Sequence, residues 1–448
     1  MRSKPTNGLD RRQFLEQGSL AVAAAAMLPN AVSPCFAVET PSKLIRIGVI
    51  GVGNRGRFHI TNLLTNHPDV TIPAICDLQP DRLKSAVEMV KKMRGTVPTG
   101  YSKSEHDYRN LCQRDDLDAV LIATPSYWLG RMTVDALRAG KHAGVEVNGP
   151  QTEDECWQMV EQKEQSGKRV MFLENCCYGN ETMMIFNMVN RGVFGEPYYA
   201  EGSYVHDCRH LFLDAQGKIT WRGELWRDSY GSTYPQHGLG SNCKWLGIND
   251  GDRMEYCQTM MSSPREAHAR AVAQFGPDSG PAKVEFKTGD FVPSLISTVQ
   301  GKMIRLDYSL ACTRPYSRYY LLQGTKGCWD SRSGVFLEGI SKRSDLHGGW
   351  EPLEKYQEKY QHPYWRKDGA AATRFGGHGG IDYYCLYDFV KMIREDKEPW
   401  IDVYDTASWS SLIFCSKLSL DRKGARVEMP DFTKGKWKDA AWRKNRLP

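Results

Sequence analysis

The chain lacks the cysteine spacing of a metal site or of a redox pair. Its 13 cysteines are scattered, and they contain no Cys-x-x-Cys pair and no zinc-like grouping. We therefore expect no bound metal, and we expect cysteines such as Cys76 and Cys177 to be small core residues. Disulfide pairing stays open, because the spacing gives no partner for any cysteine.

The chain also has little net charge and no apolar run of membrane-spanning length. The alanine-rich stretch Leu20 to Leu28 is too short to cross a bilayer. The formal net charge is only +6 over 448 residues, and no block of basic residues is interleaved with aromatic ones. We therefore expect no nucleic-acid partner and no stable membrane insertion once a signal segment has been removed.

Residues 1–43 have the features of a removable export signal followed by a linker. Arg11-Arg12-Gln13-Phe14-Leu15 resembles the twin-arginine pattern, and Cys35-Phe36-Ala37 is a suitable cleavage site. The twin-arginine route carries folded proteins, which suits an enzyme that acquires a nucleotide before export. The sequence thus predicts a periplasmic or secreted protein.

The remaining residues predict an α/β protein of two domains and a short tail. Short apolar strands alternate with amphipathic helices from 44 to 171, as a doubly wound parallel sheet of the Rossmann type requires. Strands are expected at 44–50, 70–76, 117–123 and 141–146, with a helix at 132–139. Residues 172–432 mix strands and helices and predict an α+β domain with one large mixed or antiparallel sheet. Residues 433–448 form a basic tail.

A glycine-rich loop follows the first predicted strand. In Gly51-Val52-Gly53-Asn54-Arg55-Gly56, the first glycine permits the tight turn and the second lets the backbone approach a pyrophosphate. Gly56 lets the next helix pack closely on the strand. The pyrophosphate would then lie at the N-terminus of that helix, where free N–H groups favour an anion. This pattern predicts a dinucleotide site.

An acidic residue stands where such a site needs one. Asp77 ends the second predicted strand, at the spacing expected for a residue that binds the ribose of the adenosine. A carboxylate accepts hydrogen bonds from the 2′-hydroxyl and repels a 2′-phosphate. We therefore predict NAD, rather than NADP, as the cofactor.

Two polar motifs of the second domain suggest a site for a small molecule. Tyr234 and His237 lie three residues apart, so their side chains share one face if a helix begins there. Arg314-Pro315-Tyr316-Ser317-Arg318 presents Tyr316 on a loop that proline stiffens. Tyr204 and Arg222 add a hydroxyl and a cation. Each motif has an alternative structural interpretation, as a satisfied core histidine or a packed surface ring.

Together, the motifs resemble one family over residues 44 to 432. The chain is similar to the Gfo/Idh/MocA oxidoreductases and, within them, to the NAD-dependent α-N-acetylgalactosaminidases of glycoside hydrolase family 109. The pieces that carry the resemblance are Gly51 to Gly56, Glu146-Val147, Glu174 to Tyr178, Tyr234 to Gly240, Arg314 to Arg318, Gly376 to Asp382 and Asp402 to Asp405.

The resemblance implies a set of site residues. Those expected at NAD are Gly51, Gly53, Asn54, Arg55, Gly56, Asp77, Ser126, Tyr127, Trp128, Leu129, Glu146, Val147, Asn175 and Tyr234. Those expected at the sugar are Tyr204, Arg222, Tyr234, Pro235, Gln236, His237 and Tyr316. Of these, His237, Tyr316 and Tyr234 are the expected catalytic residues.

The resemblance also implies a mechanism. NAD takes a hydride from C3 of the sugar and later returns it; between these steps the C2 proton and the C1 aglycone leave and water adds. Histidine suits such proton transfers, because its unperturbed pKa is about 6.5. The paired carboxylates of ordinary glycosidases are not required, and none is evident among these motifs.

Two other functions stay open. The first is a periplasmic NAD(P)-dependent sugar oxidoreductase with net turnover. The dehydrogenases of the wider group carry Glu-Lys-Pro where this chain has Glu146-Val147-Asn148, and the missing lysine favours the hydrolase. The second is a non-catalytic binding module, suggested by the departure of residues 126–129, which we expect to form a loop, from the family pattern. The expected partner is a small sugar or glycan in each case, and a homo-oligomer stays open.

Overall fold

The computed structural model describes residues 44–342 and 348–443. The predicted export signal, residues 1–43, lies outside the described residues. Within the described part of the chain, no helix is both long enough and apolar enough to cross a membrane. The 12 cysteines of this part are all free.

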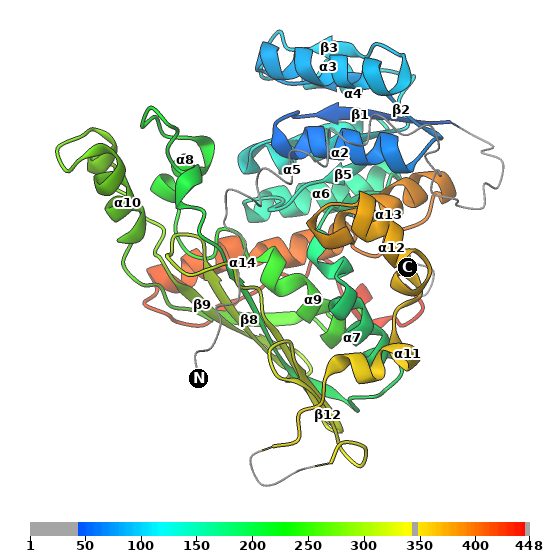
Figure 1. Ribbon diagram of the computed structural model, residues 1–448, viewed down its shortest axis with the longest axis vertical. Coiled ribbons are helices and arrows are strands. Elements are labelled where there is room, and N and C mark those ends of the chain that lie inside the picture. The colour runs from blue at the N-terminus through cyan, green and yellow to red at the C-terminus, as the bar shows by residue number, and fades with distance from the viewer. Residues whose placement is uncertain (1–43, 343–347, 444–448) are drawn as a thin grey trace, which may run out of the picture. The chain divides into compact units, whose positions relative to one another are not determined.

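The first half of the chain forms a six-stranded parallel sheet, sheet A, which confirms the predicted Rossmann-type fold (Figure 1). The strand order β3-β2-β1-β4-β5-β6 places a topological switch point between β1 and β4. The strands are β1 (Ile45–Ile50), β2 (Val70–Cys76), β3 (Thr99–Tyr101), β4 (Ala119–Ile122), β5 (His142–Val145) and β6 (Val170–Phe172). The helices of this half are α2 (Asn54–Asn66), α3 (Pro80–Arg94), α4 (Tyr108–Cys112), α5 (Ser126–Arg138) and α6 (Glu153–Ser166).

The second half forms a mixed eight-stranded sheet, sheet B, as predicted. Its order is β13-β12-β11-β7-β10-β9-β8-β14, and β7 and β10 are its parallel pair. The strands are β7 (Pro197–Val205), β8 (Met254–Thr259), β9 (Val292–Thr298), β10 (Met303–Ser309), β11 (Tyr320–Gly324), β12 (Gly327–Asp330), β13 (Gly334–Leu337) and β14 (Val427–Glu428). The helices are α7 (Asn180–Asn190), α8 (Trp221–Asp228), α9 (Gln236–Leu246), α10 (Glu266–Phe275), α11 (Gln357–Tyr360), α12 (Pro363–Phe375), α13 (Ile381–Glu395) and α14 (Val403–Asp421).

Helix α9 packs on sheet B through two glycines. A Cβ atom at Gly202 of β7 would lie 1.9 Å from the Gly238 carbonyl oxygen of α9. Only a residue without a side chain permits this approach. The close contact brings the first turn of α9, with His237, to the end of β7 that carries Tyr204.

The last helices of the chain return to sheet A, where α13 lies beside α2 (Figure 1). A Cβ atom at Gly144 of β5 would lie 2.7 Å from the Phe389 ring of α13. The Phe172 N–H of β6 donates to the Ile401 carbonyl at 3.0 Å. Residues far beyond 171 therefore cover the sheet of the first half.

The segment expected as a basic tail also packs on the fold over its described part, 433–443. Trp437 is buried, and the buried Arg443 guanidinium donates to Asp405 at 2.9 Å. The Arg443 charge is thus neutralised by a carboxylate of α14.

Candidate functional site

The glycine loop has the geometry that a dinucleotide requires. Gly51 has a φ of +86°, and its N–H donates to the Cys76 carbonyl at 2.8 Å. A Cβ atom at Gly56 would lie 1.9 Å from the Gly51 carbonyl oxygen. At Gly53 the nearest atom to an added Cβ is 3.9 Å away, so the loop surface is open there. The first turn of α2, from Asn54, follows directly and presents free N–H groups.

Asp77 stands at the carboxyl end of β2 beside this loop. Its Oδ2 accepts from the Val52 N–H at 2.8 Å, and its Oδ1 accepts from the Gln79 N–H at 2.8 Å. Each carboxylate oxygen keeps a further lone pair for a ribose hydroxyl. Asp77 therefore shapes the loop and is placed to bind a ribose.

Arg55 links the loop to two buried carboxylates. Its Nε donates to Glu146 at 2.7 Å, and its Nη2 donates to Asp382 of α13 at 2.8 Å. Glu146 also binds the His59 imidazole at 2.5 Å, and Asp382 accepts from the Asn175 amide at 2.7 Å. Five residues from four segments of the chain thus form one network.

The electrostatics of this network keep Arg55 and its two carboxylates charged. Burial alone would raise the pKa of Glu146, but the Arg55 charge and the His59 hydrogen bond lower it to about 2. Burial likewise opposes the Arg55 charge, but Glu146 and Asp382 raise its pKa. The Arg55 Nη1 atom is buried and has no hydrogen-bond partner within the described residues. A cofactor phosphate or hydroxyl at this edge would satisfy that donor.

Residues 126–129 differ from their expected conformation. They were predicted as a loop, but they form the first turn of α5, which begins at Ser126 directly after Pro125. The fixed φ of Pro125 suits a helix entrance. Ser126 and Leu129 are buried, whereas Tyr127 is 46% exposed, so Tyr127 presents the larger accessible surface.

The Glu146-Val147 segment connects the two halves through its neighbour Asn148. The Asn148 amide donates to the Thr233 carbonyl at 2.6 Å, and its own carbonyl accepts from Gln236 at 2.7 Å. Gln236 is fully buried. Its role in the structure is therefore to hold the Tyr234-to-His237 turn against the end of β5, not to present a surface to the solvent.

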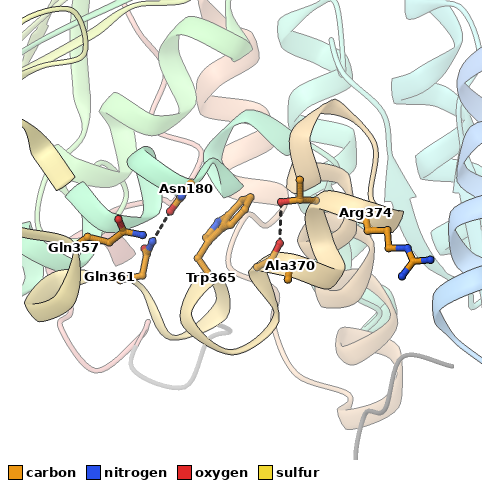
Figure 2. Close-up of a pocket in the computed structure, with 8 residues that line it drawn as sticks. Asn180, Gln357, Gln361, Trp365, Ala370 and Arg374 are labelled. Atoms are coloured by element: carbon orange, nitrogen blue, oxygen red, sulfur yellow. Dashed lines mark hydrogen bonds between the residues drawn. The ribbon is translucent and has the colours of Figure 1, made fainter. Parts of the chain in front are cut away.

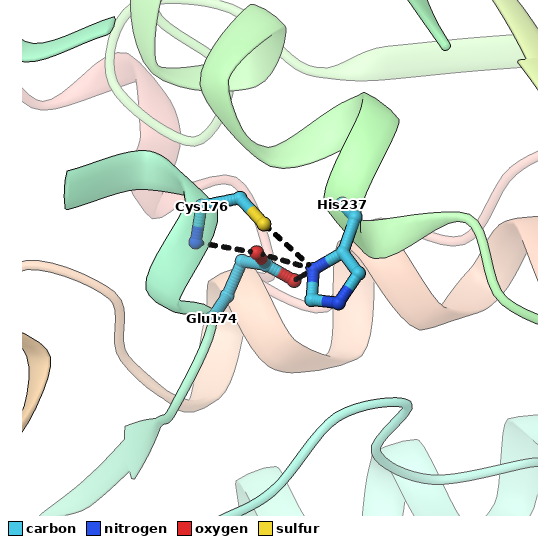
Figure 3. A group of neighbouring side chains, drawn as sticks. All are labelled: Glu174, Cys176 and His237. Atoms are coloured by element: carbon cyan, nitrogen blue, oxygen red, sulfur yellow. Dashed lines mark hydrogen bonds and ion pairs between the residues drawn. The ribbon is translucent and has the colours of Figure 1, made fainter. Parts of the chain in front are cut away.

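His237 is the centre of the second part of the site (Figure 3). Its Nδ1 lies 2.8 Å from Oε1 of Glu174 and 3.1 Å from Sγ of Cys176, and its Nε2 lies 3.2 Å from the Tyr234 hydroxyl. Tyr234 precedes helix α9, which begins at Gln236 with Pro235 as its N-cap residue, and its side chain meets that of His237 as their spacing predicts. The arrangement is a carboxylate, an imidazole and a phenol in a row.

This row holds a proton at neutral pH. Burial disfavours the charged imidazole, but Cys176 and Glu174 outweigh it and raise the pKa of His237 to about 10. Burial raises the pKa of Tyr234 well above its usual value, so that its hydroxyl stays protonated. His237 is therefore an imidazolium with Glu174 as its counter-ion.

Aromatic rings line the side of His237 that faces away from Glu174. The Tyr204 ring is edge-on to the His237 ring, with 4.7 Å between the ring centroids, and its centroid lies 5.5 Å from that of Tyr234. The centroid of the Tyr316 ring lies 6.3 Å from that of Tyr204, and Tyr316 is 53% exposed. These rings offer apolar faces and hydroxyl groups together, as sugar binding requires.

The remaining sugar-site predictions are placed less centrally. Arg222, at the start of α8, is exposed, and its guanidinium lies 4.2 Å from the centroid of the Trp221 ring. Pro235 is the N-cap residue of α9. Pro235 directly follows Tyr234 in the sequence. The Arg222 charge acts to lower the pKa of Tyr234, against the larger effect of burial.

Four residues join the site that the sequence did not select. Glu174 and Cys176 flank the selected Asn175, Asp382 binds Arg55, and Arg318 donates to the Cys176 sulfur. Glu174 directly follows the predicted end of a buried strand at the edge where ligands bind, and this position could have identified it. The roles of Cys176 and Arg318 depend on a contact 142 residues apart along the chain, which the sequence pattern does not show.

Glu174, Cys176 and His237 could also be metal ligands, since their ligand atoms lie within 4.8 Å of one another. However, the Arg318 guanidinium lies against the Cys176 sulfur. The Cys176 sulfur, one of the three ligand atoms, therefore already has a hydrogen-bond donor as its partner. The group is better suited to hold a proton.

A separate pocket of about 490 Å³ lies beside α12 (Figure 2). It is lined by Asn180, Gln357, Gln361, Trp365, Gly369, Ala370, Thr373 and Arg374. None of the predicted site residues lines it. The assembled polar cluster around Arg55 and His237 is therefore the candidate site.

Comparison with known families matches both halves of the chain. Residues 45–173 match the oxidoreductase family with the NAD-binding Rossmann fold. Residues 178–439 match the glycosyl hydrolase 109 C-terminal domain.

Curated relatives are similar over nearly the whole length. A glycosyl hydrolase family 109 protein of Solibacter usitatus is 37% identical over 95% of this chain and 98% of its own. An alpha-N-acetylgalactosaminidase of Shewanella oneidensis is 37% identical over 89% of this chain and 87% of its own.

Solved structures share the fold. A levoglucosan dehydrogenase in complex with NADH has a TM-score of 0.65 at 17% identity, covering 87% of this chain and all of that one. A scyllo-inositol dehydrogenase of Lactobacillus casei with bound NAD(H) and scyllo-inositol has a TM-score of 0.60 at 16% identity, covering 86% of this chain and 99% of that one.

Proposed function

Because the chain belongs to glycosyl hydrolase family 109, we propose that it is an exported NAD-dependent glycosidase acting on alpha-N-acetylgalactosaminide-like sugars. The observation that carries the proposal is the Glu174–His237–Tyr234 row at the same site as an NAD-type glycine loop. A simple binding module needs no buried imidazolium that can exchange its proton with a phenol.

NAD, when bound, supplies an acceptor and donor of hydride for C3 of the sugar, so that the aglycone leaves by elimination and water adds to C1. The open backbone at Gly53 and the N-terminus of α2 would hold its pyrophosphate. Asp77 would hold the adenosine ribose, and Arg55 and Asn175 would meet its remaining polar groups. These residues bind and orient, and Asp382 keeps Arg55 and Asn175 in place.

His237 carries the mobile proton of the reaction. Glu174 fixes the Nδ1 side, so Nε2 is the atom that exchanges a proton with Tyr234 and with the sugar. Because the pKa of His237 is raised to about 10, the imidazolium predominates at neutral pH. It would therefore give a proton to the oxygen of the departing aglycone and, as the neutral imidazole, take one from the water that adds to C1.

The rings beside His237 hold the sugar. Tyr204 and Tyr316 offer hydroxyl groups and faces for a pyranose ring, and the exposed Arg222 offers a cation for its oxygen atoms. Tyr316 is also the second group for proton transfer. Its exposure of 53% lets its proton exchange with the solvent.

The direct experiment is the release of p-nitrophenol from its α-N-acetylgalactosaminide by purified protein without added nucleotide. We expect turnover, together with NAD in the extract of the denatured protein. An absence of glycoside cleavage, with steady reduction of added NAD by a free sugar, would instead establish the oxidoreductase alternative. The missing lysine at Val147 favours the hydrolase over that alternative.

We also propose that the mature protein acts outside the cytoplasm, on the basis of the Arg11-Arg12 segment. A fusion of residues 1–43 to a reporter that needs the twin-arginine route would test this. Replacement of both arginines by lysine should retain the reporter in the cytoplasm.

A further inference from the structure

A second imidazole lies on the other side of Tyr204. His206 follows Tyr204 by two residues at the end of β7, so both side chains lie on the same face of the strand. The Tyr204 hydroxyl lies 3.4 Å from Nδ1 of His206. In the tautomer with hydrogen on Nε2, the hydroxyl donates to Nδ1. Tyr204 thus has a proton acceptor of its own.

His206 also contacts the outer wall of the sugar site. Its ring is edge-on to that of Tyr316, with 5.0 Å between the centroids. The Tyr204 ring is edge-on to that of His237, with 4.7 Å between the centroids. Tyr204 therefore stands between two imidazoles, and its hydroxyl lies within hydrogen-bonding distance of His206.

The groups around the two imidazoles give them opposite protonation states. Burial lowers the pKa of His206; the charges of His210 and His237 lower it further, and Asp207 opposes them. Tyr316, the neighbour from the loop before β11, is neutral because burial raises its pKa. His206 is thus neutral where His237 is charged, and such a divergence separates a proton acceptor from a proton donor.

We propose that His206 is a positioning residue that accepts, through Tyr204, the proton of the sugar hydroxyl whose carbon is oxidised. This inference rests on the proposed function. The sugar O–H bond breaks and its proton moves to the Tyr204 oxygen, while the proton of Tyr204 moves to Nδ1 of His206. The C–H electron pair leaves as hydride to the nicotinamide dinucleotide, and the carbonyl forms. The proton leaves His206 for the solvent, which keeps it separate from the proton on His237.

The activity test uses His206→Asn in the holoenzyme. Asparagine still accepts a hydrogen bond from Tyr204, but it does not titrate. We expect kcat to fall by about 10²-fold with little change in KM. In the wild-type enzyme kcat should decrease towards acid pH as His206 becomes protonated, and this decrease should be absent in the variant. Imidazole should restore part of the activity of His206→Ala. His268→Asn, at an exposed histidine of α10, should behave as wild type. A normal pH profile in His206→Asn would overturn the inference.

A measurement without turnover separates this inference from the proposed function. The pH titration of the His206 ring is followed by NMR in wild type and in Tyr204→Phe, without sugar. We expect the titration of His206 to shift when the hydroxyl is removed, because the two groups share a proton. An unchanged titration would overturn the Tyr204–His206 pairing whether or not the protein cleaves glycosides. A shifted titration with no cleavage would keep the pairing and reject the glycosidase.

Discussion

At the scale of single residues, the site depends on one histidine whose two nitrogens have different partners. Nδ1 of His237 faces the Glu174 carboxylate, and Nε2 faces the Tyr234 hydroxyl. An imidazole held at one nitrogen has a fixed orientation, and its other nitrogen is free to exchange a proton. The same division of roles explains why a buried carboxylate lies behind the histidine and not in the sugar pocket.

His237→Ala should abolish most of the activity and leave the fold intact. A positioned acid–base group contributes about 10²–10⁴-fold to the rate, so kcat should fall by that order. The bound NAD should be close to that of wild type, with His210→Ala as the matched control. The melting temperature should fall, because the buried Glu174 loses its counter-ion. Activity near that of wild type would assign His237 a purely structural role.

Glu174→Gln should make the stability of the protein less dependent on pH. The pKa of His237 is raised from 6.5 to about 10 in the folded protein. Its pairing with Glu174 therefore stabilises the fold fully below about pH 6.5 and loses this effect as the pH rises through about 10. The difference in melting temperature between wild type and variant should be largest just below pH 6.5, shrink as the pH rises from there, and vanish above about pH 10. A difference that is constant with pH would contradict this assignment.

At the scale of elements, the cofactor loop is fixed by contacts that leave no room for side chains. The loop joins β1 to α2, and its first and last glycines touch each other. The carboxyl end of β2 supplies Asp77, which binds the loop backbone as well. Both contacts can be tested by single substitutions.

Gly56→Ala should separate α2 from β1. The new Cβ would lie 1.9 Å from the Gly51 carbonyl oxygen, so the helix has to move. Overpacking of this kind costs about 1–3 kcal/mol of unfolding free energy, and NAD binding should weaken with it. Gly280→Ala is the control, because Gly280 has a φ of −56° and nothing within 4 Å of an added Cβ. Equal stability of the two variants would refute the packing argument.

Asp77→Asn should relax the choice between NAD and NADP. The amide keeps an acceptor for the Val52 N–H, but it removes the charge that repels a 2′-phosphate. A hydrogen bond to a charged group contributes about 1.5–3 kcal/mol, so NAD affinity should fall by about 10-fold or more. Calorimetric titration of the nucleotide-free protein with both cofactors measures this, and an unchanged preference would remove Asp77 from the ribose site.

The sequence predicts local elements of the site better than contacts between distant ones. The β1 strand, the glycine loop and the turn before α9 follow from neighbouring residues, and the structure confirms their geometry. The prediction of a loop at residues 126–129 was wrong, because helix α5 begins at Ser126, directly after Pro125. Arg318 at Cys176 and Asp382 at Arg55 could not be predicted, since these contacts exist only after sheets A and B have formed.

At the scale of the whole molecule, the cofactor site and the sugar site form one network. Asn148 at the end of β5 holds Thr233 and Gln236, next to the catalytic turn. Arg55 beside the glycine loop reaches Asp382 of α13. The proposed hydride and proton transfers would therefore both depend on residues from both halves.

Hydrolysis in deuterium oxide should place deuterium at C2 of the released sugar. If the aglycone leaves by elimination, the C2 hydrogen departs and is replaced from the solvent. A thioglycoside should also be cleaved, because elimination depends little on protonation of the leaving atom. Mass spectrometry and NMR of the product measure the label, and product that keeps its C2 hydrogen throughout would exclude elimination.

The ion pair between Arg55 and Asp382 joins residues 327 positions apart, and this separation sets an order of events during biosynthesis. A ribosome translates the glycine loop long before it translates Asp382, so the emerging N-terminal half lacks the carboxylate that orients Arg55. The Phe389 ring that covers β5 arrives later still. Under the proposed function, NAD would therefore be loaded after α13 has been translated. If the protein is exported folded, as proposed above, the cofactor would be acquired between the translation of α13 and export.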